Sequence, residues 1–340
     1  MSKKALVIGA TGGFGQAMAR MLVADGWQVT ALMRNPRTLP KGLEAVAIVA
    51  GDARNARDVR RAARGVDVIV QGFNVLYPRW GEDWPQANRA AMAAAGDSGA
   101  TILFPGNIYN YGTDAGAILD EETPQNPDTR KGILRRSLER ELEADAKARG
   151  YRVIVLRASD YFGPGQNGGW LDDVVVKNLD EGVVRYPAPL ESRHSWAYLP
   201  DLAKAGLGLL KARDSMKAFE TFHFRGHSEV TGLELVNAIR KVRGHDELKV
   251  KRLPWWLVRL LGLVLPMMRE IYEMRWLWQV PHVLDDRKLR AMLPDLAETP
   301  LDTAIAAVIA ERKPFSSTQP TELPGSGHQV AQGHVSAIGQ

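Results

Sequence analysis

The chain of 340 residues contains no cysteine, which excludes disulfide bridges, a thiol nucleophile and cysteine metal ligands. It also lacks a long uninterrupted apolar run. The most hydrophobic stretch, from Leu253 to Pro266, is broken by Arg259 and bounded by prolines. A helix that spans a bilayer needs about 20 apolar residues, so we expect no stable membrane insertion. The stretch predicts a buried or lid-forming helix, with contact at a membrane interface as the alternative.

The chain has little excess charge of either sign, because its 44 Lys and Arg residues nearly balance its 39 Asp and Glu residues and leave a formal net charge of +5. One basic cluster occurs at helical spacing: Arg54, Arg57, Arg60, Arg61 and Arg64. No aromatic residue is interleaved and no nucleic-acid motif accompanies it, so we interpret it as a solvated helix face and expect no nucleic-acid partner. The apolar stretch near the N-terminus is too short for a secretory signal, which predicts a cytoplasmic protein.

Apolar, strand-like runs alternate with helical patterns through the first half of the chain. The runs cover 5–8, 27–32, 45–49, 66–70, 101–104 and 152–156. This alternation predicts an α/β fold of the Rossmann type, a doubly wound parallel sheet with helical crossovers. A long helix is expected from Thr129 to Arg149, capped by Asp128 or Thr129 and ended by Gly150.

The character of the sequence changes after Gly163-Pro164-Gly165, where glycine, proline and tryptophan occur at irregular spacing. We therefore expect residues 1–165, with 190–225 returning to them, to form a dinucleotide-binding core. Residues 166–189 and 226–312 are expected to form a smaller, interleaved C-terminal substrate lobe. The stretch 313–340 is rich in polar residues without an apolar period, which predicts a flexible tail.

The most informative motif is the turn Gly9-Ala10-Thr11-Gly12-Gly13-Phe14-Gly15 between the first strand and the first helix. Its glycines permit a tight turn and let the backbone approach a pyrophosphate, and the helix start directs free N–H groups at negative charge. The motif predicts binding of a dinucleotide cofactor. The contacting residues are expected to be Gly9, Thr11, Gly12, Gly13, Phe14 and Gly15.

Arg34 follows the second strand, where an NAD-specific site usually places an acidic group for the ribose hydroxyls. An arginine there suits a 2′-phosphate, so NADP(H) is favoured over NAD(H). An ordinary surface arginine is the alternative. Asp52 and Ala53, just past the third strand, are expected to contact the adenine. Asp52 also suits the cap of the following helix.

Further motifs resemble the extended short-chain dehydrogenase/reductase family, of the NAD-dependent epimerase/dehydratase type. Besides the glycine turn, they are Gly51-Asp52, Asn88, Tyr111-Gly112, Arg157 with Gly163-Pro164-Gly165, and the stretch from His194 to Ala203. The resemblance runs from residue 3 to about residue 310. It implies a Rossmann fold and an NAD(P)-dependent enzyme.

The chain departs from that family at its proton relay. Members usually carry Tyr-x-x-x-Lys on the fifth helix, the tyrosine exchanging the proton and the lysine holding the nicotinamide ribose. The equivalent segment here is Lys131-Gly132-Ile133-Leu134-Arg135, and no Tyr-x-x-x-Lys occurs anywhere in the chain. Asn107 stands where the family has Ser or Thr after the fifth strand. The standard relay is therefore not carried over.

Three side chains are candidates to replace the relay: Asn107, Tyr109 and Lys131. Lys131 and Arg135 lie four apart on one predicted helix and share a face, so both can reach the cofactor ribose and the substrate. Asn107 and Tyr109 follow the fifth strand, on the side where parallel sheets bind ligands. The alternatives are surface ion pairs with Glu139 for the two cations and simple packing for Tyr109.

The predicted substrate contacts are Tyr111, Arg135, Asp160, Tyr161, Trp170, His194 and Trp196. Asp160 and Tyr161 follow the sixth strand, which places them near the nicotinamide. The tryptophans suit an aromatic wall, although they can equally form the core of the small lobe. For Tyr111 and His194 the alternatives are packing and bonding to local backbone. Nothing lies at metal-ligand spacing from His194, so no metal site is expected.

Together these features predict an NAD(P)-dependent oxidoreductase. It would transfer hydride to or from a small carbonyl-like, apolar or aromatic substrate by a non-standard proton relay. Two other functions stay open: a sugar-nucleotide epimerase or dehydratase, and a non-catalytic NADP(H)-sensing binding protein. A small-molecule substrate is expected as partner, and the sequence does not decide between a monomer and a homodimer.

Overall fold

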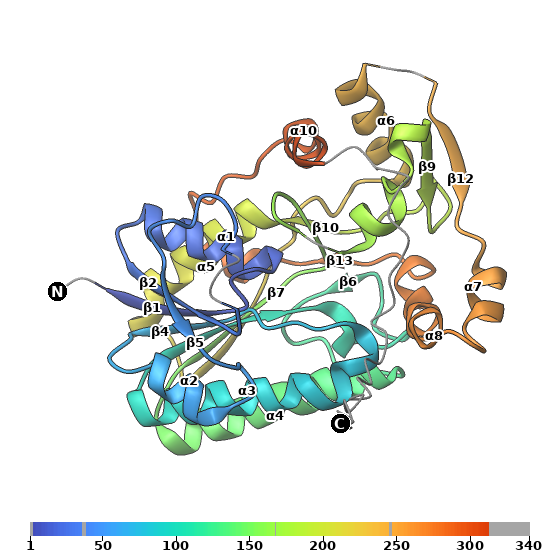
Figure 1. Cartoon of the computed structure of the whole chain (residues 1–340). Helices are drawn as coiled ribbons and strands as arrows, with labels where there is room; N and C mark the ends of the chain where they lie inside the picture. Colours follow the sequence, from blue (N-terminus) through green and yellow to red (C-terminus); the bar gives the residue numbers. More distant parts are fainter. Residues whose placement is uncertain (1–2, 36–38, 167, 245–246, 313–340) are drawn as a thin grey trace, which may run out of the picture.

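A seven-stranded parallel sheet forms the centre of the computed structural model, which describes residues 3–35, 39–166, 168–244 and 247–312 (Figure 1). Its order is β11, β7, β5, β4, β1, β2, β3. The strands are β1 (Lys4–Ile8), β2 (Gln28–Met33), β3 (Ala47–Ala50), β4 (Val68–Gln71), β5 (Thr101–Gly106), β7 (Val153–Arg157) and β11 (Phe219–His223). The chain starts in the middle and builds outward in both directions. The predicted doubly wound Rossmann-type fold is confirmed.

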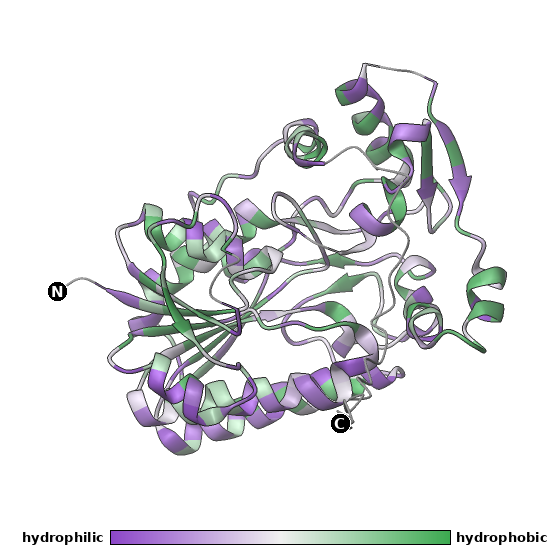
Figure 2. Ribbon diagram, viewed as in Figure 1, coloured by the Kyte–Doolittle hydropathy of each residue, from purple (hydrophilic) through white to green (hydrophobic). Residues whose placement is uncertain are grey.

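Helices cover both faces of the sheet, because its strands are apolar on both sides. One face carries α1 (Gly13–Ala24) and α5 (Leu199–Ala212); the other carries α2 (Ala56–Ala62), α3 (Trp80–Ser98) and α4 (Arg130–Arg149) (Figure 1). Figure 2 shows hydrophobic residues gathered in the strands and many hydrophilic residues along α4. The side chain of Thr129 caps α4 and Gly150 ends it, as the sequence predicted.

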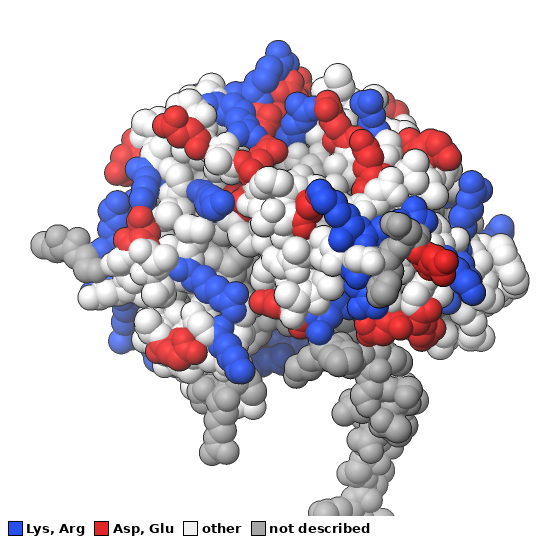
Figure 3. Space-filling model, turned by 90° about the horizontal axis from the view of Figure 1, so that it is seen from above, with Lys and Arg blue, Asp and Glu red and all other residues white. Residues whose placement is uncertain are grey.

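Most of the arginine cluster lies on α2. Its side chains pair with neighbouring carboxylates: Arg60 with Asp97 at 2.7 Å and Arg61 with Asp58 at 2.8 Å. The arginines of α2 are thus interspersed with acidic partners, and the opposite side of the molecule, seen from above in Figure 3, likewise mixes basic and acidic side chains. The arrangement matches a solvated helix face rather than a continuous basic surface.

The smaller lobe is built from short parallel strand pairs and helices. The pairs are β6 (Ile118–Leu119) with β13 (Val283–Leu284), β8 (Asp160–Phe162) with β10 (Trp196–Tyr198), and β9 (Val183–Tyr186) with β12 (Lys249–Arg252). The helices are α6 (Gly232–Arg243), α7 (Trp255–Leu261), α8 (Pro266–Glu273) and α10 (Leu301–Glu311). In contrast, α9 (Arg287–Met292) packs against β11, and its Leu289 is buried in the core of the large sheet. The expected tail, 313–340, lies outside the described residues.

The apolar stretch around residues 253–266 differs from the expected single helix. It forms the separate helices α7 and α8, because Pro266 cannot continue a preceding helix and instead occupies the first turn of α8. Of the two expected positions, the buried one is wrong for α7, since Val258 is its only buried residue. Among the described residues, no helix combines the length and apolar character needed to cross a membrane.

Candidate functional site

The turn between β1 and α1 is shaped by close backbone packing. Gly9 has a φ of +81°, and a Cβ at this position would lie 2.3 Å from the carbonyl oxygen of Gly72, so no larger residue fits. The N-cap of α1 is Gly12, and no side chain caps the first turn. The first N–H groups of α1 are therefore available to an anion, which fits the pyrophosphate of a dinucleotide.

A cavity of about 530 Å³ begins at this turn. Gly12, Gly13 and Phe14 line its first end, and the loops after β4, β5 and β7 line its middle. Its far end is formed by Met267 and Ile271 of α8. The position at the carboxyl ends of the strands, beside the point where the strand order reverses, is where open α/β sheets bind ligands. The volume is that of a small-molecule site.

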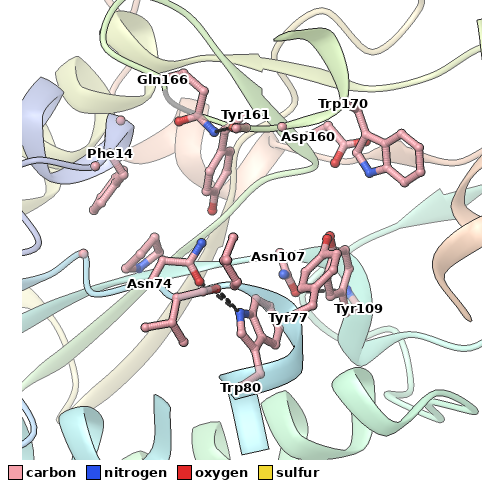
Figure 4. A pocket seen from close by; sticks show the side chains of 18 of the residues that line it. Phe14, Asn74, Tyr77, Trp80, Asn107, Tyr109, Asp160, Tyr161, Gln166 and Trp170 are labelled. Atoms are coloured by element: carbon pink, nitrogen blue, oxygen red, sulfur yellow. Dashed lines mark hydrogen bonds between the residues drawn. The ribbon is translucent and has the colours of Figure 1, made fainter. Parts of the chain in front are cut away.

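Aromatic rings form much of the cavity wall (Figure 4). They are Phe14, Phe73, Tyr77, Trp80, Trp84, Phe104, Tyr109, Tyr161 and Trp170. Trp80 and Trp84 stack with ring centroids 5.3 Å apart, and Trp80 stacks against Tyr109 at 6.0 Å. The predicted aromatic wall therefore exists, but Trp80 and Trp84 contribute more of it than the tryptophans selected from the sequence.

Two tyrosines share a hydrogen bond at the cavity. The hydroxyls of Tyr77 and Tyr109 lie 2.8 Å apart. Burial raises the pKa of Tyr77 to about 12 and raises the pKa of Tyr109 well above its usual value. Both phenols are therefore neutral near pH 7 and able to donate a proton. Asn107 lines the cavity beside them, and its side-chain oxygen accepts a hydrogen bond from the Tyr109 N–H at 3.1 Å.

The position of Tyr109 depends on α4. A Cβ on Gly132 would lie 2.1 Å from the carbonyl oxygen of Tyr109, so glycine lets the first turn of α4 pack directly against this backbone. The same turn is held by Thr129, whose hydroxyl oxygen accepts a hydrogen bond from the Gly132 N–H. Gly132 thus lets α4 pack closely against the backbone of Tyr109.

Arg135 is a buried cation at the cavity wall, as predicted from its place on the helix face. Its guanidinium lies 4.4 Å from the ring centroid of Trp84 and donates to the carbonyl oxygen of Pro105 at 3.0 Å. Its Nε has no hydrogen-bond partner, and no carboxylate pairs with it, among the residues that the structure describes. Burial lowers the pKa of Arg135. The alternative, a surface ion pair with Glu139, is not what the structure shows, because Glu139 binds the buried Arg157 at 2.5 Å.

Lys131 lies away from the expected place. It is only 3% exposed and does not line the cavity; its ammonium binds Glu270 and Glu273 of α8. Its Nζ also lies 4.8 Å from the ring centroid of Tyr77. A group held between two carboxylates behind the cavity wall is not positioned to touch a cofactor ribose or a substrate. The structure thus corrects the catalytic and ribose-binding roles expected for Lys131, and shows instead an anchor for α8.

The predicted substrate contacts divide into two groups. Four of the seven line the cavity, namely Arg135, Asp160, Tyr161 and Trp170, whereas Tyr111, His194 and Trp196 do not. Tyr111 is buried, with its hydroxyl 3.0 Å from Nε2 of His223. The direct contacts expected of these three residues are therefore not what the structure shows, because each is enclosed in the core of the smaller lobe.

His194 is nevertheless connected to the cavity through one residue. Its Nε2 lies 2.6 Å from Oδ2 of Asp160, and its ring stacks on Trp278 with centroids 3.9 Å apart. Asp160, the residue that His194 contacts, lines the cavity. The histidine therefore acts through Asp160, by fixing the carboxylate.

The edge expected to hold the adenosine part of the cofactor is charged. Arg34 is exposed after β2, and Asp52 binds the guanidinium of Arg54 at 2.6 Å. Hydrogen bonds from Arg54, with a smaller contribution from the charge of Arg34, lower the pKa of Asp52. Asn55 rather than Asp52 caps α2. Ala53 is buried and Thr11 is exposed in the glycine turn.

Sequence reasoning missed several lining residues, Tyr77 and Phe73 among them. Tyr77 lies in a single 3₁₀ turn, Tyr77–Arg79, after β4. The carboxyl end of every parallel strand faces the ligand side, so the loop after Gln71 carried the signal that would have found it.

The fold and the cavity define a dinucleotide-binding α/β protein of the extended short-chain dehydrogenase/reductase type. Residues 5–223 match the profile of the NAD dependent epimerase/dehydratase family, and the chain belongs to this family.

Relatives and solved structures agree with this assignment. A ceramide reductase from Caulobacter vibrioides is 32% identical over 108 residues, which is 30% of this chain and about a third (34%) of that protein. The UDP-N-acetylglucosamine 4-epimerase of Methanobrevibacter ruminantium, solved with UDP-N-acetylmuramic acid, is 16% identical with a TM-score of 0.72, over 91% of this chain and 97% of that chain. The enzyme WbmH of Bordetella bronchiseptica, solved with NAD+, is 17% identical with a TM-score of 0.68, over 91% and 98%. At these identities the two structures show the shared fold.

The ion cluster at α8 gives a first prediction. Replacing Lys131 with alanine leaves two largely buried carboxylates without their buried cation, which should lower the free energy of unfolding by about 3 kcal/mol. Urea unfolding measures this loss. Arg130→Ala is the matched control, because Arg130 binds the same two carboxylates but its side chain is 63% exposed, so its loss should cost at most about 1 kcal/mol. Equal costs for the two variants would contradict the anchoring role.

The same cluster predicts a pH dependence. Burial acts to raise the pKa of Glu273, but hydrogen bonds from Lys131 and Arg130 outweigh it, and the pKa lies below its ordinary value of 4.5. A carboxyl with a depressed folded-state pKa stabilises the fold fully above the unfolded pKa and loses this effect as the pH falls below it. The stability difference between wild type and Glu273→Gln should therefore shrink as the pH falls below 4.5. A difference that stays constant across this range would refute the assignment.

Proposed function

We propose that the protein is an NADP(H)-dependent oxidoreductase that transfers hydride to or from a carbonyl carbon in a largely apolar substrate. The observation that carries the proposal is the cavity itself. It joins the dinucleotide turn to an aromatic chamber, and the chamber contains neutral tyrosine hydroxyls and a buried arginine that pairs with no carboxylate of the described residues. Aromatic walls exclude water and bind apolar groups, while the few polar groups orient the reacting oxygen.

Tyr109 is the proposed proton donor. A bound nicotinamide supplies or takes up the hydride, and the carbonyl oxygen that becomes negative must receive a proton. The Tyr109 phenol is neutral and lines the cavity, and the Tyr77 hydroxyl can stabilise the resulting phenolate through their hydrogen bond. Asn107 and Arg135, which line the same cavity, stabilise the developing charge on the oxygen. This assignment replaces Lys131 with Tyr77 in the proposed relay.

An apolar substrate has independent support from the relatives. The ceramide reductase similarity links part of this chain to reduction of a lipid. The second candidate, a sugar-nucleotide epimerase or dehydratase, is supported by the activities named for the structural neighbours. The two differ in cofactor use, since a reductase consumes NADPH in proportion to product and an epimerase returns its cofactor unchanged. Cofactor binding without any turnover would instead support the sensing role.

The proton relay is tested by removing single hydroxyls. Tyr109→Phe should lower kcat for NADPH-dependent carbonyl reduction by at least a hundredfold, the scale of general acid catalysis, with little change in KM. Tyr77→Phe should have a smaller effect, because Tyr77 acts through Tyr109. Steady-state kinetics with a panel of apolar ketones and aldehydes measure both.

Tyr111→Phe is the matched control for this series. It removes the same group two residues further along, from a side chain that binds His223 and does not line the cavity. Its kcat should stay near that of the wild type. The relay is refuted if Tyr109→Phe keeps full activity, or if Tyr111→Phe loses as much.

Cofactor preference is tested at Arg34. Arg34→Ala should weaken NADP(H) binding by about 1.5–3 kcal/mol, the scale of a charge-assisted hydrogen bond, and leave NAD(H) binding nearly unchanged. Titration calorimetry with both cofactors measures the difference. Arg89→Ala, an exposed arginine that pairs with Glu141 on α4, should change neither affinity. Equal losses for both cofactors, or tighter binding of NADH by the wild type, would overturn the preference.

A further inference from the structure

The corner between α7 and α8 carries the largest group of exposed apolar side chains among the described residues. They are Trp256, Leu257, Leu260, Leu261, Leu263, Val264 and Leu265, which we call the apolar corner. Leu263 is 81% exposed and Val264 is 75% exposed. The other exposed large apolar side chains are spread over distant parts of the sequence. A contiguous group of this kind marks an interaction surface.

The backbone of the apolar corner is already hydrogen-bonded within itself. The N–H groups of Leu263, Val264 and Leu265 donate to carbonyl oxygens of Leu260 and Leu261 at 2.8 to 3.1 Å. Pro266 has no N–H to satisfy. A segment whose donors are paired internally can leave water for an apolar medium without losing hydrogen bonds.

Along the chain, the apolar corner is flanked by basic residues. From Lys249 to Arg269 the sequence holds five cations and no Asp or Glu: Lys249, Lys251, Arg252, Arg259 and Arg269. All five side chains are exposed. The next carboxylate along the chain, Glu270, is buried and bound to Lys131. In Figure 3 the right-hand end of the molecule, where α7 lies in Figure 1, shows uncharged atoms with Lys and Arg beside them, and Asp and Glu further inward.

Exposed apolar side chains flanked by cations favour one kind of binding partner for the apolar corner. A second copy of the chain, placed symmetrically, would bring the two sets of cations together without acidic partners, which costs free energy. A lipid surface with anionic headgroups offers negative charge to the cations and hydrocarbon to the leucines. We propose that the apolar corner docks the protein on the surface of an anionic bilayer, as a peripheral contact without a spanning segment.

Docking through the apolar corner would also bring the cavity close to the bilayer surface. α8 continues directly from the apolar corner, and its Met267 and Ile271 line the cavity. Trp255, at the start of α7, packs against Trp170 of the cavity wall with ring centroids 6.0 Å apart. One short hairpin thus joins the bilayer surface to the chamber. This second step rests on the proposed function, because it gives an apolar carbonyl substrate a route from the lipid phase.

The test is co-sedimentation of the purified full-length protein with vesicles. Wild type should bind vesicles of phosphatidylcholine with phosphatidylglycerol, bind pure phosphatidylcholine at least tenfold more weakly, and be released by high salt. Leu263→Asp should weaken binding to the anionic vesicles at least tenfold. Leu233→Asp is the matched control, an exposed leucine on α6 outside the corner, and should bind like wild type. Thermal melts of both variants should match the wild type, because neither leucine is buried.

The docking proposal is overturned if the wild type remains in the supernatant with anionic vesicles, or if Leu233→Asp loses as much binding as Leu263→Asp. It is also overturned if the wild type is a dimer in solution that Leu263→Asp converts to a monomer, since the corner would then belong to a second copy. The readout is independent of catalysis. A protein that binds vesicles but oxidises no NADPH loses the proposed function and keeps the docking surface, and a protein that reduces soluble carbonyls without binding vesicles does the opposite.

Discussion

The cavity depends on the ion cluster that fixes α8 to the start of α4. Without the contacts of Lys131 and Arg130 with Glu270 and Glu273, α8 would have little to hold it, because its buried surface is small: Glu270 is its one buried residue. The cluster closes the far end of the chamber and supports the ring of Tyr77 from behind. Charge at a buried position is costly unless it is paired, so the cluster also specifies one position for the helix.

The cluster gives a physical reason for the departure from the family motif. A lysine at position 131 cannot serve where the family places its tyrosine, because its ammonium is held by two carboxylates of a distant helix. Under the proposed function, the phenols of Tyr109 and Tyr77, which meet in the neighbouring loops, would handle the proton instead. Gly132, next to Lys131, connects the two regions, because its lack of a side chain lets α4 pack on the Tyr109 backbone.

Features that depend on neighbouring residues in the chain could be predicted from the sequence, whereas contacts between residues far apart in the chain could not. The strands, the glycine turn and the cap at Thr129 follow from periodicity and short motifs, and Asn107 and Tyr109 follow from their place after β5. The partners of Lys131 lie far along the chain, and charge alone did not distinguish Glu139 from Glu270. The apolar stretch was recognised, but its exposure depends on how much of the smaller lobe covers it, which no local pattern states.

Two buried arginines differ in their partners, and this difference bears on ligand binding in the chamber. Arg157 is fully buried and is neutralised by Glu139, which makes it a structural pair. Arg135, nearly as buried, lies against the rings of Trp84 and Trp80 and donates to the carbonyl oxygen of Pro105. Stacking on an aromatic face offsets part of the cost of removing a guanidinium from water, but among the described residues the Nε of Arg135 still lacks an acceptor. Under the proposed function, a substrate oxygen that develops negative charge would supply this acceptor, and the burial that lowers the pKa of Arg135 would strengthen its attraction for that oxygen.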